Sequence, residues 1–325
     1  MKAIQLHGFE GSPSLKLVDI DKPTPAPMEV LIEVKAAGIN YADVEQARGR
    51  YPTFGKEPPF VLGFEAAGIV RETGKEVAGV RPGDFVTAVV SSGGYAEFAV
   101  APGNAVIPIP KNLSFNEATT IPIQGMSAYT MLKYAVMPVL PRSILVQAAA
   151  GGVGLFLVQI AKHFGIQKVI ALASSEDKLA LLQSLGADVT INYMKPHWSD
   201  KVRQATDGRG VDAVLQMSSG AIGEESFKLA APGGRIVMFG AQNYHDAIST
   251  EQVRLLIWQN QTVAGFAYPT LAPEQIAESL PEFLDLVEKN SIRVLADHTY
   301  PLSQAAEAHK LILSRKSVGK IVLIP

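Results

Sequence analysis

A chain of 325 residues is long enough to form two domains. Hydrophobic residues make up 47% of it and charged residues 18%, which excludes a disordered chain and provides sizeable cores. The net charge of -2 gives no indication of nucleic-acid binding. Cysteine is absent, which excludes disulfides, thiolate nucleophiles and cysteine-ligated metals and suits a cytoplasmic protein.

Residues 1–121 are predicted to form strands and loops. Short β runs occur at residues 30–34, 69–70 and 85–89, and a turn sequence at 81–84 precedes the last of them. Prolines divide the region into short pieces, and no long helical period appears until close to its end. We therefore expect this segment to form the first part of a β-rich domain.

Residues 122–268 alternate strands with helices. A strand at 144–146 is followed by apolar side chains at helical spacing over 153–164, and Gly165 is the expected end of that helix. Further strands are expected at residues 169–172, 189–191, 211–215, 235–239 and 262–264. This alternation predicts an α/β fold with a doubly wound parallel sheet, the Rossmann arrangement.

Residues 269–325 are too few to form a domain of their own. Helices are expected at 274–289 and 303–313, with Pro281 interrupting the first, and a strand is expected at 320–323. We expect this segment to return to the N-terminal domain and complete it.

One uncharged stretch, residues 143–161, has about the length of a membrane span. Gln147 and Gln159 interrupt its apolar character, and a glycine-rich turn lies in its middle. A strand, a tight turn and a buried helix explain this pattern better than a membrane span does, so we expect no membrane association.

The turn between the first strand and the first helix of this α/β region carries a nucleotide-binding fingerprint. Ala149, Gly151 and Gly154 occupy the three small positions of G-x-G-x-x-G, with Ala in the first. Glycines allow the backbone to approach a pyrophosphate, and the free N–H groups of the helix N-terminus bind its charge. We expect Gly151, Gly152, Val153 and Gly154 to contact a dinucleotide.

The end of the second strand indicates which dinucleotide is bound. An NAD site has a carboxylate there to hold the ribose hydroxyls, whereas this strand ends in Ala173, Ser174 and Ser175. Either serine can cap the next helix or donate to a 2′-phosphate, and the acids at 176–177 belong in the first turn of that helix. Lys178 would supply positive charge, unless it is simply solvated. The sequence therefore favours NADPH.

Short motifs are spread in order over the whole chain, at residues 37–43, 63–68, 81–84, 148–154, 185–188, 191–193, 232–235 and 319–325. Together they resemble the medium-chain dehydrogenase/reductase superfamily. Within it, they are most similar to the zinc-free quinone oxidoreductase, or zeta-crystallin-like, group. The resemblance implies a GroES-like β-rich substrate domain beside the Rossmann domain, an active site in the cleft between them, and a homodimer.

The resemblance also implies NADPH contacts in both domains. These are Asn40, Ser127, Gly151 to Gly154, Ser174, Lys178, Tyr193, Phe239, Gly240, Phe266 and Lys320. Two positions depart from the pattern of the group: Gln147 stands where many relatives have His, and residues 216–220 replace an acidic residue followed by Val-Gly-Gly.

The zinc alcohol dehydrogenases of the same superfamily provide a test for metal binding. Their cysteine ligand aligns with Asn40 and their histidine ligand with Phe64. Their four-cysteine loop would follow Val90, where only residues 91–94 precede Tyr95. The histidines are scattered without paired ligand spacing, at His7, His163, His197, His245, His298 and His309. We therefore expect no metal site.

Without zinc there is no Lewis acid to form an alkoxide, which disfavours oxidation of ordinary alcohols. A hydride can instead add to a quinone or an α,β-unsaturated carbonyl, whose oxyanion is delocalised and needs only neutral hydrogen-bond donors. Asn40 and Tyr51 are the candidate catalytic residues. Tyr51 could stack on the acceptor, hydrogen-bond to it, or only pack within its loop. Asp43 is expected to be a structural hydrogen-bonding residue.

A second class of function stays open. A zinc-free relative could bind NADPH without useful turnover, as a structural or sensing protein, and its cofactor-binding residues would look the same. A homodimer would place the strand expected at 262–264, which lies at the edge of the sheet, against a second copy.

Overall fold

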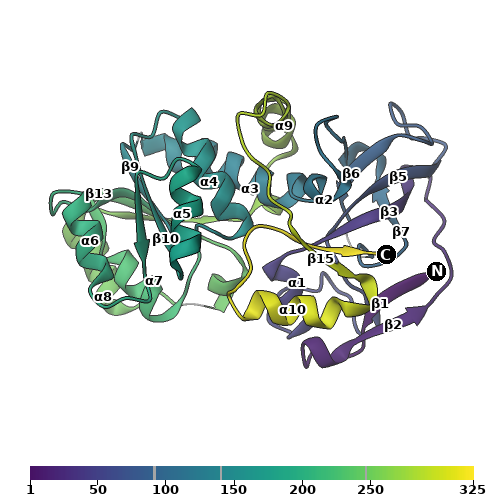
Figure 1. Ribbon diagram of the computed structural model, residues 1–325, viewed down its shortest axis with the longest axis horizontal. Helices are drawn as coiled ribbons and strands as arrows, with labels where there is room; N and C mark the ends of the chain where they lie inside the picture. Colours follow the sequence, from purple (N-terminus) through teal and green to yellow (C-terminus); the bar gives the residue numbers. More distant parts are fainter. Residues whose placement is uncertain (91–92, 140, 246) are drawn as a thin grey trace. The chain divides into compact units, whose positions relative to one another are not determined.

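The computed structural model describes residues 1–90, 93–139, 141–245 and 247–325. Its internal packing divides the chain into two units. Residues Met1–Ile123 together with Val294–Pro325 form unit 1, and residues Gln124–Arg293 form unit 2. The two ends of the chain, purple and yellow in Figure 1, therefore belong to the same unit.

Unit 1 is β-rich, as its short β runs predict, and most of its strands pair in the antiparallel sense. The strands are β1 (Lys2–Leu6), β2 (Leu15–Asp19), β3 (Glu29–Ile39), β4 (Phe60–Val61), β5 (Glu65–Thr73), β6 (Phe85–Val89), β7 (Phe98–Pro102), β8 (Val106–Pro108), β15 (His298–Pro301) and β16 (Ile321–Ile324). A three-stranded sheet has the order β2-β1-β4. A seven-stranded sheet has the order β15-β16-β3-β5-β6-β8, with β7 also paired to β3.

Strand β3 is central to unit 1 because it pairs with β5, β7 and β16. Apolar side chains from both ends of the chain, such as Ile32 and Leu323, share one core. The helices of the unit are α1 (Tyr41–Ala47), α2 (Phe115–Ala118) and α10 (Ala305–Leu313). The sequence did not predict α1, because its seven residues are too few to show a helical period.

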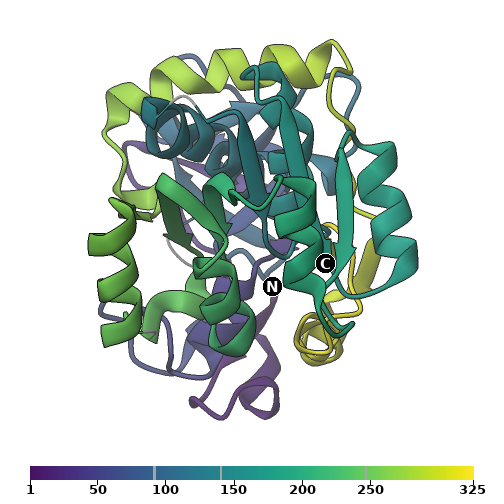
Figure 2. The same cartoon turned by 90° about the vertical axis from the view of Figure 1, so that its left-hand side faces the viewer.

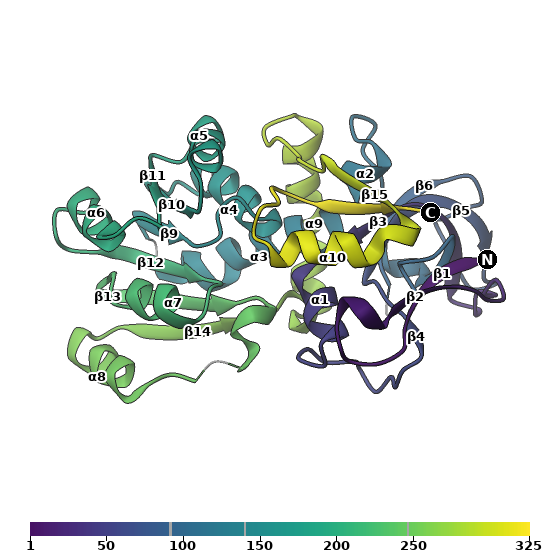
Figure 3. The same cartoon turned by 60° about the horizontal axis from the view of Figure 1, so that its bottom comes forward.

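Unit 2 contains one sheet of six parallel strands, which confirms the predicted Rossmann arrangement. The strands are β9 (Ser143–Val146), β10 (Lys168–Ala173), β11 (Val189–Asn192), β12 (Val211–Gln216), β13 (Ala230–Phe239) and β14 (Thr262–Phe266). Their order is β11-β10-β9-β12-β13-β14, and Figure 3 shows it from top to bottom. Counted from β9 this order is 3-2-1-4-5-6, that of a dinucleotide-binding sheet.

The helices of unit 2 connect and cover these strands. They are α3 (Met126–Thr130), α4 (Gly152–His163), α5 (Glu176–Ser184), α6 (Trp198–Ala205), α7 (Gly220–Phe227), α8 (Thr250–Gln259) and α9 (Pro273–Glu288). π-Helical turns flank α3 at Ile121–Gly125 and Met131–Val136. Right-handed crossovers that run in opposite directions from the centre of the sheet place α4 and α5 on one face and α7 and α8 on the other.

Helix α9 corrects the prediction that Pro281 interrupts it. The helix is continuous over sixteen residues with Pro281 inside, and Figure 2 shows it unbroken across the top. Phe283, two residues further on, is fully buried, and its ring lies 5.7 Å from that of Phe156 and 6.0 Å from that of Tyr129. This packing outweighs the hydrogen bond that proline cannot donate.

Both this aromatic packing and a set of ion pairs attach α9 to unit 2. Lys133 binds Glu278 at 2.8 Å and Glu282 at 2.7 Å, so α9 is also held by ion pairs to the helical segment that follows α3. The chain was expected to leave the Rossmann region after residue 268, whereas by its packing it does so after Arg293. The earlier boundary, after Ile123, lies close to the one expected after residue 121.

The uncharged stretch at residues 143–161 is divided between β9 and α4, with the glycine-rich turn between them. Within the part of the chain that the structure describes, no helix combines the length and the apolar character that a bilayer-spanning segment needs.

Candidate functional site

The glycine-rich turn between β9 and α4 has the geometry that a bound pyrophosphate requires. Gly151 is the N-cap residue of α4, so the N–H groups of the following turn have no partner within the helix. A Cβ atom on Gly154 would lie 2.5 Å from the carbonyl oxygen of Ala148, so this glycine allows close packing of α4. A Cβ on Gly151 would meet, among the described atoms, only that oxygen, at 3.1 Å. The turn therefore fits a dinucleotide.

Two predicted cofactor residues meet at the carboxyl ends of β10 and β11. The backbone N–H of Tyr193 donates to the carbonyl oxygen of Ala173 at 3.1 Å, which places Tyr193 beside Ser174. Because all six strands are parallel, these ends lie at the same edge of the sheet as the glycine-rich turn.

Two further predicted residues meet at the ends of β13 and β14. Phe239 pairs with Phe266 in the parallel register, and Phe239 is almost fully buried. Gly240 follows with a φ of 82°, a conformation that favours glycine, and turns the chain away from the sheet. These residues therefore lie at the same edge as the glycine-rich turn.

The segment after β10 shows how the 2′-phosphate end of a dinucleotide could be held. Ser175, one of the two serines that could cap the next helix, is the N-cap residue of α5. Its side chain accepts no capping hydrogen bond, so capping does not occupy its hydroxyl. Glu176 is held by Lys195 at 2.6 Å. Lys178 is half-buried, and burial lowers the pKa of its ammonium group. Lys178 is therefore not a simply solvated surface lysine.

Ser127 lies on α3 and is half-buried. Gln124, one helical turn earlier, packs against the turn, since a Cβ on Gly152 would overlap its side-chain amide. Ser127 follows Gln124 by three residues, and its contact with the cofactor stays a prediction.

The two departures from the group's pattern contact each other. The side-chain oxygen of Gln147 accepts the backbone N–H groups of Met217 at 3.0 Å and Ser218 at 2.7 Å. Gln147 is almost fully buried. A glutamine carbonyl can accept both N–H groups at once, so Gln147 fixes the segment after β12. Sequence reasoning noted both positions but not their pairing, which joins residues seventy positions apart.

In unit 1, Asn40 and Lys320 come together with Glu65, to which the sequence had assigned no role. The Lys320 ammonium is fully buried, forms an ion pair with Glu65, and donates to Asn40 Oδ1 at 2.9 Å. Asn40 Nδ2 donates to Glu65 Oε1 at 2.8 Å. Burial raises the pKa of the Glu65 carboxyl, and the Lys320 ammonium opposes the rise. The sequence signal that could have found Glu65 was its place as the single charged residue of the segment 63–68.

Asp43 holds Asn40 from its backbone side. Asp43 Oδ2 accepts the backbone N–H of Asn40 at 2.6 Å, which supports the structural role expected for this acid. Burial raises the pKa of the Asp43 carboxyl to about 7, and the neighbouring Glu65 charge adds to the rise.

The buried Tyr95 hydroxyl lies 3.2 Å from Nε2 of His309, and burial lowers the pKa of that imidazole to about 4.

Tyr51 belongs to a cluster of three aromatic rings in unit 1. Its ring centroid lies 6.3 Å from that of Phe64, and the ring of Phe54 lies at the same distance on Phe64. Both rings stand nearly perpendicular to Phe64, at 78° and 88°. Phe54 is 64% exposed, with a left-handed φ of 55°. Phe64 directly precedes Glu65 in the chain.

Among the described residues, no group of three or more His, Cys, Asp or Glu side chains could hold a metal ion. Two positions align with metal ligands of the zinc alcohol dehydrogenases. At the first, the amide of Asn40 is hydrogen-bonded to Glu65 and Lys320. At the second, Phe64 has a hydrocarbon ring. Residues 91–92, in the short segment that replaces the four-cysteine loop, lie outside the described part of the chain.

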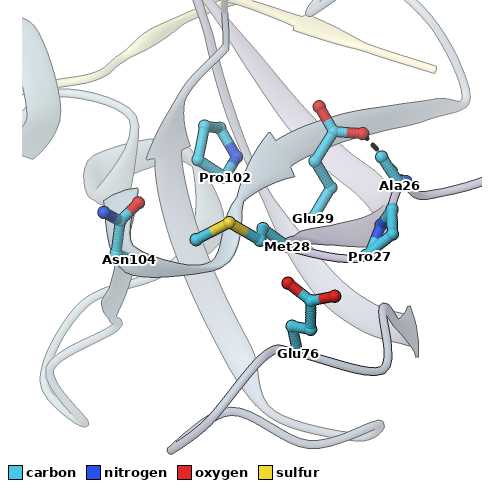
Figure 4. Close-up of a pocket in the computed structure, with 7 residues that line it drawn as sticks. All are labelled: Ala26, Pro27, Met28, Glu29, Glu76, Pro102 and Asn104. Carbon is cyan, nitrogen blue, oxygen red and sulfur yellow. Dashed lines mark hydrogen bonds between the residues drawn. The ribbon is translucent and has the colours of Figure 1, made fainter.

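A pocket of about 530 Å³ in unit 1 lies apart from all these residues. Figure 4 shows its lining of Ala26, Pro27, Met28, Glu29, Glu76, Pro102 and Asn104. Glu29 accepts the backbone N–H of Ala26 at 3.0 Å. None of the predicted site residues lines this pocket, so we assign no role to it.

Comparison with known proteins covers both units. The alcohol dehydrogenase GroES-like domain family matches residues 26–111, and the zinc-binding dehydrogenase family matches residues 152–289. The quinone oxidoreductase of Rattus norvegicus is 30% identical over 100% of this chain and 98% of its own length. That of Pseudomonas aeruginosa is 32% identical over 100% and 99%. Escherichia coli quinone oxidoreductase, crystallised in complex with NADPH, has a TM-score of 0.91 at 28% identity, covering 100% of both chains.

A Rossmann sheet inserted into a GroES-like β-rich unit defines a protein of the medium-chain dehydrogenase/reductase superfamily. Full-length identity of 30% or more to quinone oxidoreductases narrows the assignment. The chain belongs to the quinone oxidoreductase family, the zeta-crystallin-like group of that superfamily. The fold and family predicted from the sequence are thereby confirmed.

The raised pKa of Asp43 predicts a pH dependence of stability. Between pH values near 4 and near 7 the unfolded chain loses this proton while the folded chain keeps it, so stability falls as the pH rises. Asp43→Asn removes this effect and retains an oxygen for the Asn40 N–H. The free energy of unfolding of the variant relative to wild type should therefore rise from about pH 5 to about pH 8 in urea titrations. Asp19→Asn, at an exposed position, is the control, and an equal difference at both pH values would refute the prediction.

Proposed function

We propose that this protein is a zinc-independent, NADPH-dependent reductase of quinones or α,β-unsaturated carbonyls. The observation that carries the proposal is the conjunction of a dinucleotide-binding turn in unit 2 with a neutral amide, Asn40, where zinc-dependent relatives have a metal ligand. Neutral donors stabilise a delocalised oxyanion, such as a phenolate or enolate, better than a localised alkoxide.

The proposed cofactor site lies at the carboxyl edge of the parallel sheet. The first turn of α4 would bind the pyrophosphate, and Ser174, Ser175 and Lys178 would bind the 2′-phosphate. Tyr193, Phe239, Gly240 and Phe266 lie at the same edge, and Ser127, on α3, would also contact the cofactor. Support comes from the E. coli relative, which was crystallised with NADPH.

The proposed reaction adds a hydride and a proton to the acceptor and leaves NADP⁺. NADPH, when bound, supplies the hydride, and the proton comes from water. Asn40 would donate a hydrogen bond to the acceptor oxygen as negative charge develops there. Tyr51, Phe54 and Phe64 would hold the acceptor, because aromatic rings pack well against planar conjugated molecules. This ring cluster favours cyclic quinones over acyclic enones as acceptors.

The expected cofactor preference is NADPH over NADH by about tenfold or more, or about 1.4 kcal/mol, because one charge-assisted contact supplies that much. Fluorescence titration of the purified protein measures both affinities. Lys178→Met should weaken NADPH binding and leave NADH binding unchanged, whereas Lys201→Met, on α6, should change neither. Equal affinities of wild type for the two cofactors would overturn this assignment.

Turnover should follow the acceptor chemistry. We expect NADPH oxidation with a quinone or conjugated enone, no comparable oxidation of simple alcohols, and no loss of activity with a chelator. Asn40→Ala should lower turnover by about 100-fold, as loss of an oxyanion donor does in favourable cases. A protein that binds NADPH but turns over no acceptor would be the structural or sensing alternative. Faster oxidation of ethanol than reduction of any acceptor would exclude the proposal.

The same assay separates the roles open to Tyr51. Tyr51→Phe keeps the ring and removes the hydroxyl, so unchanged turnover indicates stacking and a large loss indicates a hydrogen bond. If neither Tyr51→Phe nor Tyr51→Leu changes kcat or KM, the residue only packs within its loop.

We also propose a homodimer formed through the edge of the six-stranded sheet. β14 is the last strand of the sheet and pairs with β13. The adjacent helix α8 has no buried residue, and Ile257 and Trp258 are 74% and 83% exposed. A second copy would cover these side chains and pair the open edge by the same contacts.

Light scattering at micromolar concentration should give twice the chain mass, and Ile257→Glu together with Trp258→Glu should give a monomer, because paired carboxylates at a two-fold interface repel. Leu17→Glu together with Met28→Glu, a matched change at two exposed apolar residues of unit 1, should leave the dimer intact. A monomeric wild type would contradict the proposal.

A further inference from the structure

The cluster of Asn40, Glu65 and Lys320 is assembled by strand register. Ile321 of β16 pairs with Ile39 of β3, so Lys320 stands opposite Asn40. Gly38 of β3 pairs with Glu65 of β5, so the acid approaches from the other side. Three strands, two from the N-terminal part of the chain and one from its end, therefore bring the three side chains to one point.

Gly38 makes this convergence possible. A Cβ atom built on Gly38 would overlap both the carboxylate of Glu65 and the Lys320 side chain. Its φ needs no glycine, since Gly38 is not among the residues with positive φ. The absence of a side chain at Gly38 is therefore required by the ion pair that crosses above it, not by the backbone conformation.

The ion pair occupies both ends of the Asn40 amide. Lys320 donates to the side-chain oxygen of Asn40 at 2.9 Å. The side-chain nitrogen of Asn40 donates to Glu65 at 2.8 Å. Rotating the amide end for end would place the amino group against the ammonium and the carbonyl against the carboxylate. Both contacts would be repulsive, so the charges fix which end of the amide is the donor.

Stability alone does not account for such a pair. The side chains of Glu65 and Lys320 have no exposed surface. The cost of taking two charges out of water cancels much of their attraction, so a pair of apolar residues at these positions would stabilise the strands equally well. Orienting a neighbouring polar group is a task that apolar residues cannot perform.

We propose that Glu65 and Lys320 are positioning residues that hold the amide of Asn40 in its donor orientation, and that Lys320 acts through Asn40 rather than by binding the cofactor. This inference rests on the proposed function, in which the amide stabilises the oxyanion of the acceptor. Gly38 serves the same purpose by leaving room for the pair.

The decisive experiment removes both charges together, because a single substitution would leave one buried charge unpaired and could unfold the protein. Glu65→Gln with Lys320→Met should fold and bind NADPH with a Kd within about threefold of wild type, while kcat for a quinone falls about tenfold or more. The matched control is Lys22→Met with Glu72→Gln, an exposed ion pair in the same unit, which should leave kcat unchanged.

A double-mutant cycle with Asn40→Ala separates positioning from general damage. If the pair acts through Asn40, the triple variant that combines Asn40→Ala with Glu65→Gln and Lys320→Met should have a kcat less than about twofold below that of Asn40→Ala alone. Additive losses would overturn the proposal. A tenfold weaker NADPH affinity with unchanged kcat would do so too, and would make Lys320 a cofactor ligand. Gly38→Ala, which retains every polar group, should lower kcat in the same way.

A signal independent of turnover distinguishes failure of this inference from failure of the proposed function. In protein labelled with ¹⁵N at asparagine, the Asn40 side-chain amide, assigned by its loss in Asn40→Ala, should be protected from exchange with water. The protection should disappear in Glu65→Gln with Lys320→Met and persist in the control pair. If wild type reduces no quinone or enone, the proposed function fails, while the exchange data still decide whether the pair holds Asn40. An amide that exchanges freely in wild type overturns the positioning role.

Discussion

The buried ion pair between Glu65 and Lys320 ties the last strand of the chain to two strands from its first quarter. Neither charge contacts water, so each depends on the other for its compensation. The ladder from β16 through β3 to β5 therefore has to be complete before the amide of Asn40 is placed. The pair thus joins the two ends of the chain within the first unit, and the nucleotide-binding unit lies between these ends in the sequence.

In unit 2 the constraint is the parallel register of the sheet. Parallel strands bring all their carboxyl ends to one edge, so residues far apart in sequence, such as Tyr193 and Phe266, need no individual device to reach the same place. Local contacts then refine the edge. Gln147 binds the segment after β12, and the side chain of Asn243 donates to the carbonyl oxygens of Gln216 and Phe239 at 2.7 and 2.9 Å. Backbone architecture thus brings the predicted cofactor residues to one edge, and buried amides fix the loops there.

The sequence predicted those features that depend on local pattern. Short apolar runs and helical spacing identified the strands of the Rossmann sheet and helix α4, which ends two residues before Gly165, a glycine with positive φ. The pattern failed where packing between distant segments decides. Pro281 reads locally as an interruption, yet aromatic contacts of Phe283 keep α9 continuous. Lys320 was expected, from the family resemblance alone, to contact NADPH, because nothing near it in the sequence shows that Glu65 lies opposite.

Replacement of the metal ligands changes what Glu65 needs. A buried carboxylate requires a nearby cation, and with an amide at Asn40 and a hydrocarbon ring at Phe64 that cation is the ammonium of Lys320. The same ammonium polarises the Asn40 carbonyl, and polarisation along an amide strengthens its N–H donors in a buried setting. The fixed positive charge thus reaches the amide only through a hydrogen bond, a weaker field than a metal ion would exert. Such a field matches a delocalised phenolate or enolate, and this match connects the strand register of unit 1 with the class of acceptor proposed for the enzyme.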